Sequence, residues 1–457
     1  MSKNLKVTSI NMTEGNPYKI ILMFSLPLLF GNILQQLYNL VDSVVVGNYV
    51  GEKALAAVGA GFPIIFMIVS LFAGIGMGAT VMISQFFGAE DRKSISDTIN
   101  TMYTAMMIGS IPLSLIGIFV TRPMLILMKV PDDGTLDMAV TYMIIAFIGL
   151  IGVIGYNTNA GILQGLGDSK TSLIFLAIAT VINIILDVLF VVGFKWGIAG
   201  VAFATIIAQF CSWIFGIYYI NKHFDYFKIN IFNFKFKKQL FLRAMKLGIP
   251  AAIQQILFSV GTMFMQTLVN SYGSAFMAGF NGANKIDTFA FMPIQSFSVA
   301  MTTYAGQNIG AGKIDRVKKG TTAGLIISLS TCVIMCILIY PLSGFMMRMF
   351  GDSSAMIDAG ITYLHQVLPL YPFLAMVFIY SCTLRGTGET LMPLLASVIS
   401  LWLARIPAAY LLGHFFGQNY IYYSYGIGWF IGAVLLFVYY KTGKWQRHCV
   451  IKDSKTD

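Results

Sequence analysis

Charged side chains are scarce in this chain. Only 11% of its 457 residues are Asp, Glu, Lys or Arg, and 57% are hydrophobic. A soluble domain carries roughly 25% charged residues, because its surface must face water. The shortage excludes an ordinary soluble fold and indicates a surface that contacts lipid. Apolar stretches of about 20 residues, long enough to cross a bilayer, recur from Tyr18 to the end.

Cysteine pairs and catalytic motifs are also missing. The five cysteines are an odd number without a Cys-x-x-Cys pair, so they are expected to pack as small apolar residues. The glycine-rich stretch 306–313 has neither the spacing nor the hydroxyl residue of a phosphate-binding loop. We find no nucleophile beside a general base. The chain is therefore not expected to be an enzyme or to need a cofactor, and its energy source is an ion gradient or another subunit.

The apolar stretches predict an all-α integral membrane protein with twelve transmembrane helices. Polar, glycine-bearing or charged turns separate them. The expected helices span residues 17–46, 55–84, 95–120, 137–158, 170–193, 197–220, 244–270, 279–305, 317–340, 358–382, 390–413 and 421–441.

The positive charges predict the orientation in the membrane. With twelve helices both termini lie on one side, and 23 Lys and Arg residues fall in the loops and tails of that side, against 5 on the other. Positively charged loops stay in the cytoplasm, so both termini are expected there. The net charge of +11 thus reflects topology rather than binding of nucleic acid. The expected location is a bacterial cell membrane, crossed many times, with the protein acting as a monomer in contact with lipids.

Three short strings occur twice. Ser25-Leu26-Pro27 returns as Gly248-Ile249-Pro250 after 223 residues, and Gln85-x-x-Gly88-Ala89 returns as Gln307-x-x-Gly310-Ala311 after 222. Gln164-Gly165-x-Gly167-Asp168 returns as Arg385-Gly386-x-Gly388-Glu389 after 221. A unit of six helices ends on the side where it began, so two such repeats have parallel topology. We expect an N-lobe (1–220), a basic cytoplasmic linker (221–243), and a C-lobe with its basic tail (244–457).

Two acidic residues lie within helices of the first repeat, where a charge costs about 3 kcal/mol and usually has a use. Asp42 shares a helical face with Gln35, Tyr38 and Asn39, although it could instead simply end its helix. Asp187 follows Asn183 by four residues, so carboxylate and amide stack on one face. The alternative is a purely structural contact between helices.

The second repeat has one such acid, Asp287. Asn281 and Asn284 lie about one turn before it, and Lys285 is close in sequence, so a structural charge pair at the membrane boundary competes with a functional role. Gln255, Asn284 and Asp287 are candidates for a C-lobe cavity. Arg405, beside Pro407, is expected to pack against other helices or to extend toward the interface.

Taken together, these features resemble the multidrug and toxic compound extrusion (MATE) transporters over essentially the whole chain. The resemblance rests on the three repeated strings, on Asp42, and above all on Asn183-x-x-x-Asp187. It implies antiport by alternating access, exporting amphiphilic, often cationic compounds in exchange for H⁺ or Na⁺.

The resemblance also implies a set of site residues. The ion and proton site would be Asp42, Asn183, Asp187 and Thr205, with Tyr38, Tyr142 and Asn157 lining the same cavity. Na⁺ at Asp42, Asn183 and Asp187 is the only metal it implies. The expected seventh helix has glutamines and no acid, which is similar to the DinF branch of the family.

Buried carboxylates agree with this mechanism, because burial favours protonation and a second carboxylate nearby favours it further. Ionised, the same cluster with amide and hydroxyl oxygens could hold Na⁺. The alternative function is a flippase for lipid-linked or polysaccharide precursors. It would need a cationic cavity to hold pyrophosphate, and only Lys285 and Arg405 lie within helices. A membrane enzyme or receptor is the third possibility, disfavoured by the repeat.

Overall fold

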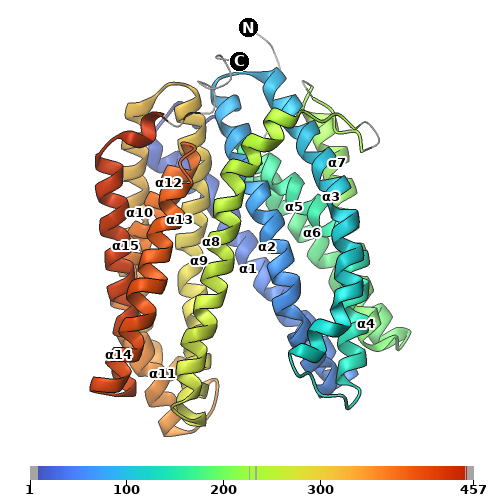
Figure 1. The fold of residues 1–457 in the computed structure, drawn as a ribbon, viewed down its shortest axis with the longest axis vertical. Helices are drawn as coiled ribbons and strands as arrows, with labels where there is room; N and C mark the ends of the chain where they lie inside the picture. The colour runs from blue at the N-terminus through green and yellow to red at the C-terminus, as the bar shows by residue number, and fades with distance from the viewer. Residues whose placement is uncertain (1–8, 226, 232–233, 448, 450–457) are drawn as a thin grey trace. The chain divides into compact units, whose positions relative to one another are not determined.

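The computed structural model describes residues 9–225, 227–231, 234–447 and 449. Within these residues all regular secondary structure is helical (Figure 1). In the described part of the chain, ten helices are long and apolar enough to cross a membrane, and eleven spans result if α4 and α5, bent by 51° at Gly149, form one broken span. The remaining expected segment is α9 (Ser274–Gly310), which carries Lys285 and Asp287. The predicted all-α membrane fold is confirmed.

Contacts divide the chain into two compact units. The first contains residues 1–10 and 30–248, and the second contains residues 11–29 and 249–457. The units differ from the expected lobes at two helices, because α1 (Pro17–Val45) and α8 (Lys238–Asn270) each pass from one unit to the other. Both transfers fall within three residues of a proline, Pro27 and Pro250.

The first unit is a helical bundle in which α2 packs against α3, α4 and α5, and α7 packs against α5 and α6. Its helices are α2 (Glu52–Gly88), α3 (Arg92–Leu127), α4 (Thr135–Ile148), α5 (Leu150–Gly165), α6 (Ser169–Asp187) and α7 (Gly197–His223). Two π-helical segments continue α1 and α6, at Val46–Val50 and Val188–Gly193.

The second unit is built around α9, which packs against α10, α11 and α12. Its other helices are α10 (Ile314–Arg348), α11 (Ser354–Val367), α12 (Tyr371–Gly386), α13 (Leu391–Val398), α14 (Ile406–Phe416) and α15 (Tyr423–Lys441). A third π-helical segment, Ile399–Arg405, joins α13 to α14 and packs against α15. Short 3₁₀ turns lie at Leu368–Leu370, Gln418–Tyr420 and Lys444–Arg447.

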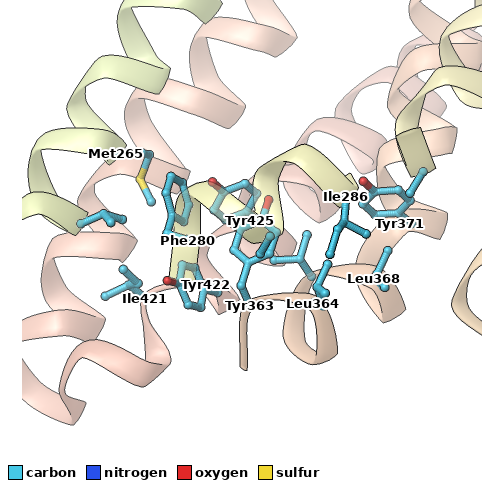
Figure 2. Close-up of a cluster of buried hydrophobic side chains, with 14 of the residues drawn as sticks. Met265, Phe280, Ile286, Tyr363, Leu364, Leu368, Tyr371, Ile421, Tyr422 and Tyr425 are labelled. Carbon is cyan, nitrogen blue, oxygen red and sulfur yellow. The ribbon is translucent and has the colours of Figure 1, made fainter. Parts of the chain in front are cut away.

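The core of the second unit is strongly aromatic. Figure 2 shows the rings of Phe280, Tyr363, Tyr422 and Tyr425 gathered together, with Tyr371 at the other end of the same cluster. Phe280 and Tyr422 stack with ring centroids 6.0 Å apart, and Tyr363 meets Tyr422 edge-on at 5.0 Å. These are the offset and edge-to-face arrangements that aromatic pairs prefer.

The repeated glycine motif has the same physical cause in both units. A Cβ on Gly165 would lie 3.0 Å from the Thr80 carbonyl oxygen, and a Cβ on Gly386 would lie 2.3 Å from that of Thr302. The second glycine of each motif, Gly167 or Gly388, has a positive φ of 86° or 98°. The motif therefore provides a close helix contact followed by a turn that favours glycine.

The acid that ends each motif caps the next helix. Asp168 accepts hydrogen bonds from the backbone N–H and the hydroxyl of Thr171, at 2.9 and 2.7 Å. Glu389 accepts from the N–H groups of Leu391 and Met392, both at 3.0 Å. These two acids are therefore structural.

Residues 11–16, ahead of α1, form a strap held by the second unit. Arg316 is its main anchor and donates to the carbonyl oxygens of Met12, Glu14 and Gly15 at 2.7–3.0 Å. The backbone N–H of Met12 donates to Gln307, the first residue of a repeated string. The start of α1 is thus fixed to the second unit although most of α1 lies in the first.

Candidate functional site

The two acids of the first unit lie where an α-helix changes into a π-helix. Asp42 lies one turn before the π-helical segment that continues α1, and Asp187 is the last residue of α6 before its own π-helical segment. Helical structure runs on from Asp42 to Val50, so Asp42 does not end its helix. π-helical turns are rare and often occur at functional sites.

The structure brings the two carboxyl groups together. Asp42 and Asp187 are close enough to interact through their side chains, and Asp187 also interacts with Asn183, one turn earlier on α6. Tyr38 lies beside Asp42 and donates a hydrogen bond to the Thr205 hydroxyl on α7, at 3.2 Å. Three helices, α1, α6 and α7, therefore supply a cluster of oxygen atoms.

The polar atoms of this cluster are buried and lack regular hydrogen-bond partners. Asn183 and Asp187 are both 0% exposed. Among the described residues, no group forms a well-aligned hydrogen bond with either carboxylate oxygen of Asp187, with Oδ1 of Asp42, or with the amide of Asn183. An unsatisfied buried polar atom costs about 1–3 kcal/mol, so such a concentration needs an explanation.

An aromatic side chain lies beside the cluster. Tyr142 on α4 lies within electrostatic range of both Asp42 and Asp187, and it packs against the buried pair Ile145 and Ile206. No described Lys or Arg forms an ion pair with either carboxyl group. The negative charge of the pair is therefore not balanced by a protein cation within the described residues.

This arrangement suits a proton or a small hard cation. Two carboxylates side by side repel each other, and a shared proton or a bound cation removes that repulsion. Carboxylate, amide and hydroxyl oxygens are also the ligands that hard cations prefer. No group of three or more His, Cys, Asp or Glu residues that would hold a transition metal occurs in the described part of the chain.

The other expected residues of this site lie farther out. Gln35 and Asn39 on α1 are exposed, without a described side-chain partner. Asn157 on α5 is exposed, and its amide donates to the Val153 carbonyl of its own helix at 2.8 Å. No described contact joins these three to the carboxyl pair, and their role in substrate binding stays a prediction.

The three candidate cavity residues of the second unit do not form one cluster. Asn284 and Asp287 lie one turn apart on α9, where Tyr363 donates to Asn284 at 3.3 Å and Tyr371 donates to Asp287. Gln255 on α8 is exposed. Its neighbour Gln254 instead bonds to other helices, donating to Ser397 and accepting from Arg385.

The two basic residues within helices of the second unit both lie against aromatic rings. Lys285 forms no ion pair with Asp287 among the described residues, and its ammonium lies 5.7 Å from the centre of the Phe350 ring. Arg405 packs, as expected, but it does not extend to the interface. It is only 4% exposed, and its guanidinium carbon lies 3.4 Å from the centre of the Tyr425 ring. Stacking on an aromatic face holds the side chain inside the unit.

Sequence reasoning missed the three π-helical segments. Each contains an intramembrane charge or begins within about one turn after it, namely Asp42, Asp187 or Arg405. A π-turn adds one residue to a helical turn, and neither the mixed sequence of Val46–Val50 nor the apolar sequence of Val188–Gly193 gives a sign of it in its composition. The intramembrane charges themselves were the available signal.

Known proteins show the same architecture and repeat. A sequence profile of the MatE family matches residues 27–189 and again 250–411, so the second match begins 223 residues after the first. The fold superimposes on an outward-facing multidrug resistance MATE transporter of the MOP superfamily with a TM-score of 0.87, 22% identity, and coverage of 97% of this chain and 98% of that one. It also superimposes on a MATE protein in a straight conformation with a TM-score of 0.89 and 21% identity, covering 96% of this chain and 98% of that one.

The chain also has curated relatives along its whole length. It is 32% identical to the probable multidrug resistance protein YpnP of Bacillus subtilis over 440 residues, 95% of this chain and 97% of YpnP. It is 27% identical to the probable multidrug resistance protein NorM of Thermotoga maritima, covering 95% and 94%. It is 24% identical to the multidrug export protein MepA of Staphylococcus aureus, covering 90% and 91%. On the strength of the profile and these relatives, the chain belongs to the MatE family of multi-pass membrane transporters.

Proposed function

We propose that this protein exports amphiphilic, mainly cationic small molecules in exchange for H⁺ or Na⁺, by alternating access. The family and the names of the relatives support multidrug efflux. The single observation that supports the antiport mechanism is the carboxyl pair Asp42–Asp187, in which both oxygens of Asp187 and Oδ1 of Asp42 are buried without well-aligned donors among the described residues. A site that needs a cation and is built into a transporter is suited to couple cation entry to export.

The roles of the residues follow from the geometry. Asp42 and Asp187 would hold the coupling ion, while Asn183 would supply a further oxygen or donor beside Asp187. Tyr38 and Thr205, joined by their 3.2 Å hydrogen bond, would position the Asp42 side of the cluster. The helix α8 carries no acidic residue, which supports placing the coupling site in the first unit, as in the DinF branch.

The experiment is transport in proteoliposomes with imposed ion gradients. Asp42→Asn and Asp187→Asn keep the side-chain shape but remove the exchangeable charge, so both should insert normally and lose gradient-driven ethidium transport. Asp287→Asn should retain more transport. If both first-unit variants transport at the wild-type rate while Asp287→Asn fails, the coupling site lies in the second unit and the assignment is wrong.

A further inference from the structure

The second unit contains a buried cation without an anion in contact. Arg405 is 4% exposed and its Nε is buried without a hydrogen-bond partner, while Tyr425 is the described residue that interacts with its guanidinium, through the ring face and a side-chain hydrogen bond. No carboxylate of the described chain lies within ion-pair distance of it. A buried guanidinium with an unsatisfied donor and no anion in contact is costly, so its free donors call for an acceptor group.

The way Arg405 is held leaves those donors available. Its Cζ atom lies 3.4 Å from the centre of the Tyr425 ring, a distance at which the flat guanidinium lies over the ring face. Stacking uses the face of the guanidinium, whereas its N–H groups point outward in its plane. The Tyr422 hydroxyl is likewise buried without a hydrogen-bond partner. A planar acceptor such as a carboxylate fits the two-pronged edge of arginine best.

Close packing fixes the position of this side chain. Arg405 ends the π-helical segment 399–405, and Ser400 in that segment donates to the Gly428 carbonyl of α15 at 2.7 Å. A Cβ on Gly428 would lie 2.8 Å from the Arg405 Cβ, so glycine is needed for this approach. The guanidinium is thus held by packing rather than by an ion pair, as expected for a preorganised binding group.

A negative charge lies in the same region. Asp287 on α9 is within electrostatic range of Arg405 but not in contact, and the Tyr371 hydroxyl donates to it. Tyr363 and Tyr425 lie within range of both charges. The second unit thus presents one positive and one negative group, both surrounded by aromatic rings and not paired with each other.

The repeat relates this region to the ion site of the first unit. Arg405 follows Asn183 by 222 residues and Tyr363 follows Tyr142 by 221, the spacings of the repeated strings. A guanidinium therefore stands in the second unit close to where the first unit has the amide beside its carboxyl pair. Because the Arg405 side chain supplies a positive charge at this position, the second unit does not need a cation from solution to balance its buried carboxylate.

We propose that Arg405 is a carboxylate-binding group, and that the second unit recognises zwitterionic amphiphiles, with the ligand carboxylate on Arg405 and its cationic end near Asp287. The inference rests on the proposed function, since it names a substrate class for the same transporter. The carboxylate of a zwitterion can pair with Arg405 while its cationic group pairs with Asp287. A simple cation leaves the free donors of Arg405 unsatisfied.

Rhodamine 110 and rhodamine 123 test this directly, because they differ only in a free carboxylate against its methyl ester. Equilibrium dialysis of both dyes against purified full-length protein measures binding without transport. Wild-type protein should prefer rhodamine 110. Arg405→Gln should weaken rhodamine 110 binding about 10–100-fold, as expected for a hydrogen bond to a charged group, and rhodamine 123 less than about twofold. Arg348→Gln, an exposed arginine at the end of α10, is the matched control and should change neither.

Two further variants keep the test decisive. Arg405→Lys retains the positive charge but loses the planar guanidinium that can donate two parallel hydrogen bonds to a carboxylate. It should therefore weaken the binding of rhodamine 110 selectively, even if the glutamine variant does not fold. Asp287→Asn should weaken both dyes, since both carry the cationic ring. Equal effects of the Arg405 variants on the two dyes, or no rhodamine 110 binding by wild-type protein, would overturn the proposal. Preferential binding of rhodamine 110 without export of either dye would instead refute the proposed efflux function.

Discussion

Asp187→Asn is expected to make the protein more stable while abolishing ion-coupled transport. Both carboxylate oxygens of Asp187 are buried without aligned donors among the described residues, and the Asp42 carboxyl lies beside them. Each unsatisfied buried group costs about 1–3 kcal/mol. Asparagine removes the negative charge and supplies an N–H₂ group that can donate to Asp42. We therefore expect the free energy of unfolding to rise by about 1–3 kcal/mol.

The assay is thermal unfolding of purified protein at neutral pH without Na⁺, together with transport in proteoliposomes. A ligand that binds only the folded state stabilises it. Adding the coupling cation should therefore raise the stability of the wild type and reduce the difference in stability between the wild type and Asp187→Asn. The variant itself should respond little to the cation. Gradient-driven transport by the variant should fall to the level of empty liposomes.

Asp168→Asn is the matched control on the same helix. Asp168 is also buried, but it accepts two hydrogen bonds from Thr171. Losing one acceptor should lower stability by about 1 kcal/mol, opposite in sign to the change at Asp187. If Asp187→Asn lowers stability and still transports, the carboxyl pair is a structural contact and the reasoning fails. If it raises stability and transports normally, the pair is strained but not the coupling site.

Three other predictions concern the loops and the strap. Arg316→Ala removes the anchor of the strap at residues 11–16 and should lower the free energy of unfolding by roughly 2 kcal/mol, with faster proteolysis of the strap, whereas Lys318→Ala, which removes an exposed ion pair, should change it little. A single cysteine replacing Lys228 should react with an impermeant thiol reagent only from the cytoplasmic side; labelling of intact cells would contradict the charge-based topology. The hydrogen bond from Thr135 and the nearby Lys53 ammonium lower the pKa of Asp133 to about 2, so its contribution to stability is present above about pH 4 and is lost as the pH falls toward 2. Asp133→Asn should remove this pH dependence from thermal unfolding curves, and an unchanged curve would refute it.

The helices and the acidic residues of the proposed ion site could be predicted from the sequence because both depend on local chemistry. Apolar length predicts a membrane helix wherever it occurs, and the twelve expected segments all correspond to helices or to broken pairs such as α4 and α5. Asn183 and Asp187 stack because four residues make about one turn. The cost of burying a charge singled out Asp42.

Contacts between helices could not be derived in this way. Thr205 and Tyr142 were expected at the site only by family resemblance, since nothing in their own sequence neighbourhood indicates that they approach Asp42. Gln254 and Gln255 are adjacent, and a rotation of about 100° per residue decides which one faces other helices. The π-helical segment before Arg405 shifts that rotation again, so the sequence pattern alone could not place its side chain inside the unit.

The difference between the two repeats is the reason why we place the proposed ion coupling in only one of them. The first unit sets two carboxyl groups side by side with no described cation, so neutrality requires an ion that comes from solution. In the second unit the carboxyl group of Asp287 lies within electrostatic range of Arg405, a cation that is fixed to the chain. Only a cation that can leave is able to carry energy from a gradient. We therefore expect that charge reversal by Arg405→Glu would create a second demand for a mobile cation in the second unit. The number of coupling ions exchanged per substrate would then rise, and unchanged stoichiometry in a folded variant would contradict this account of charge balance.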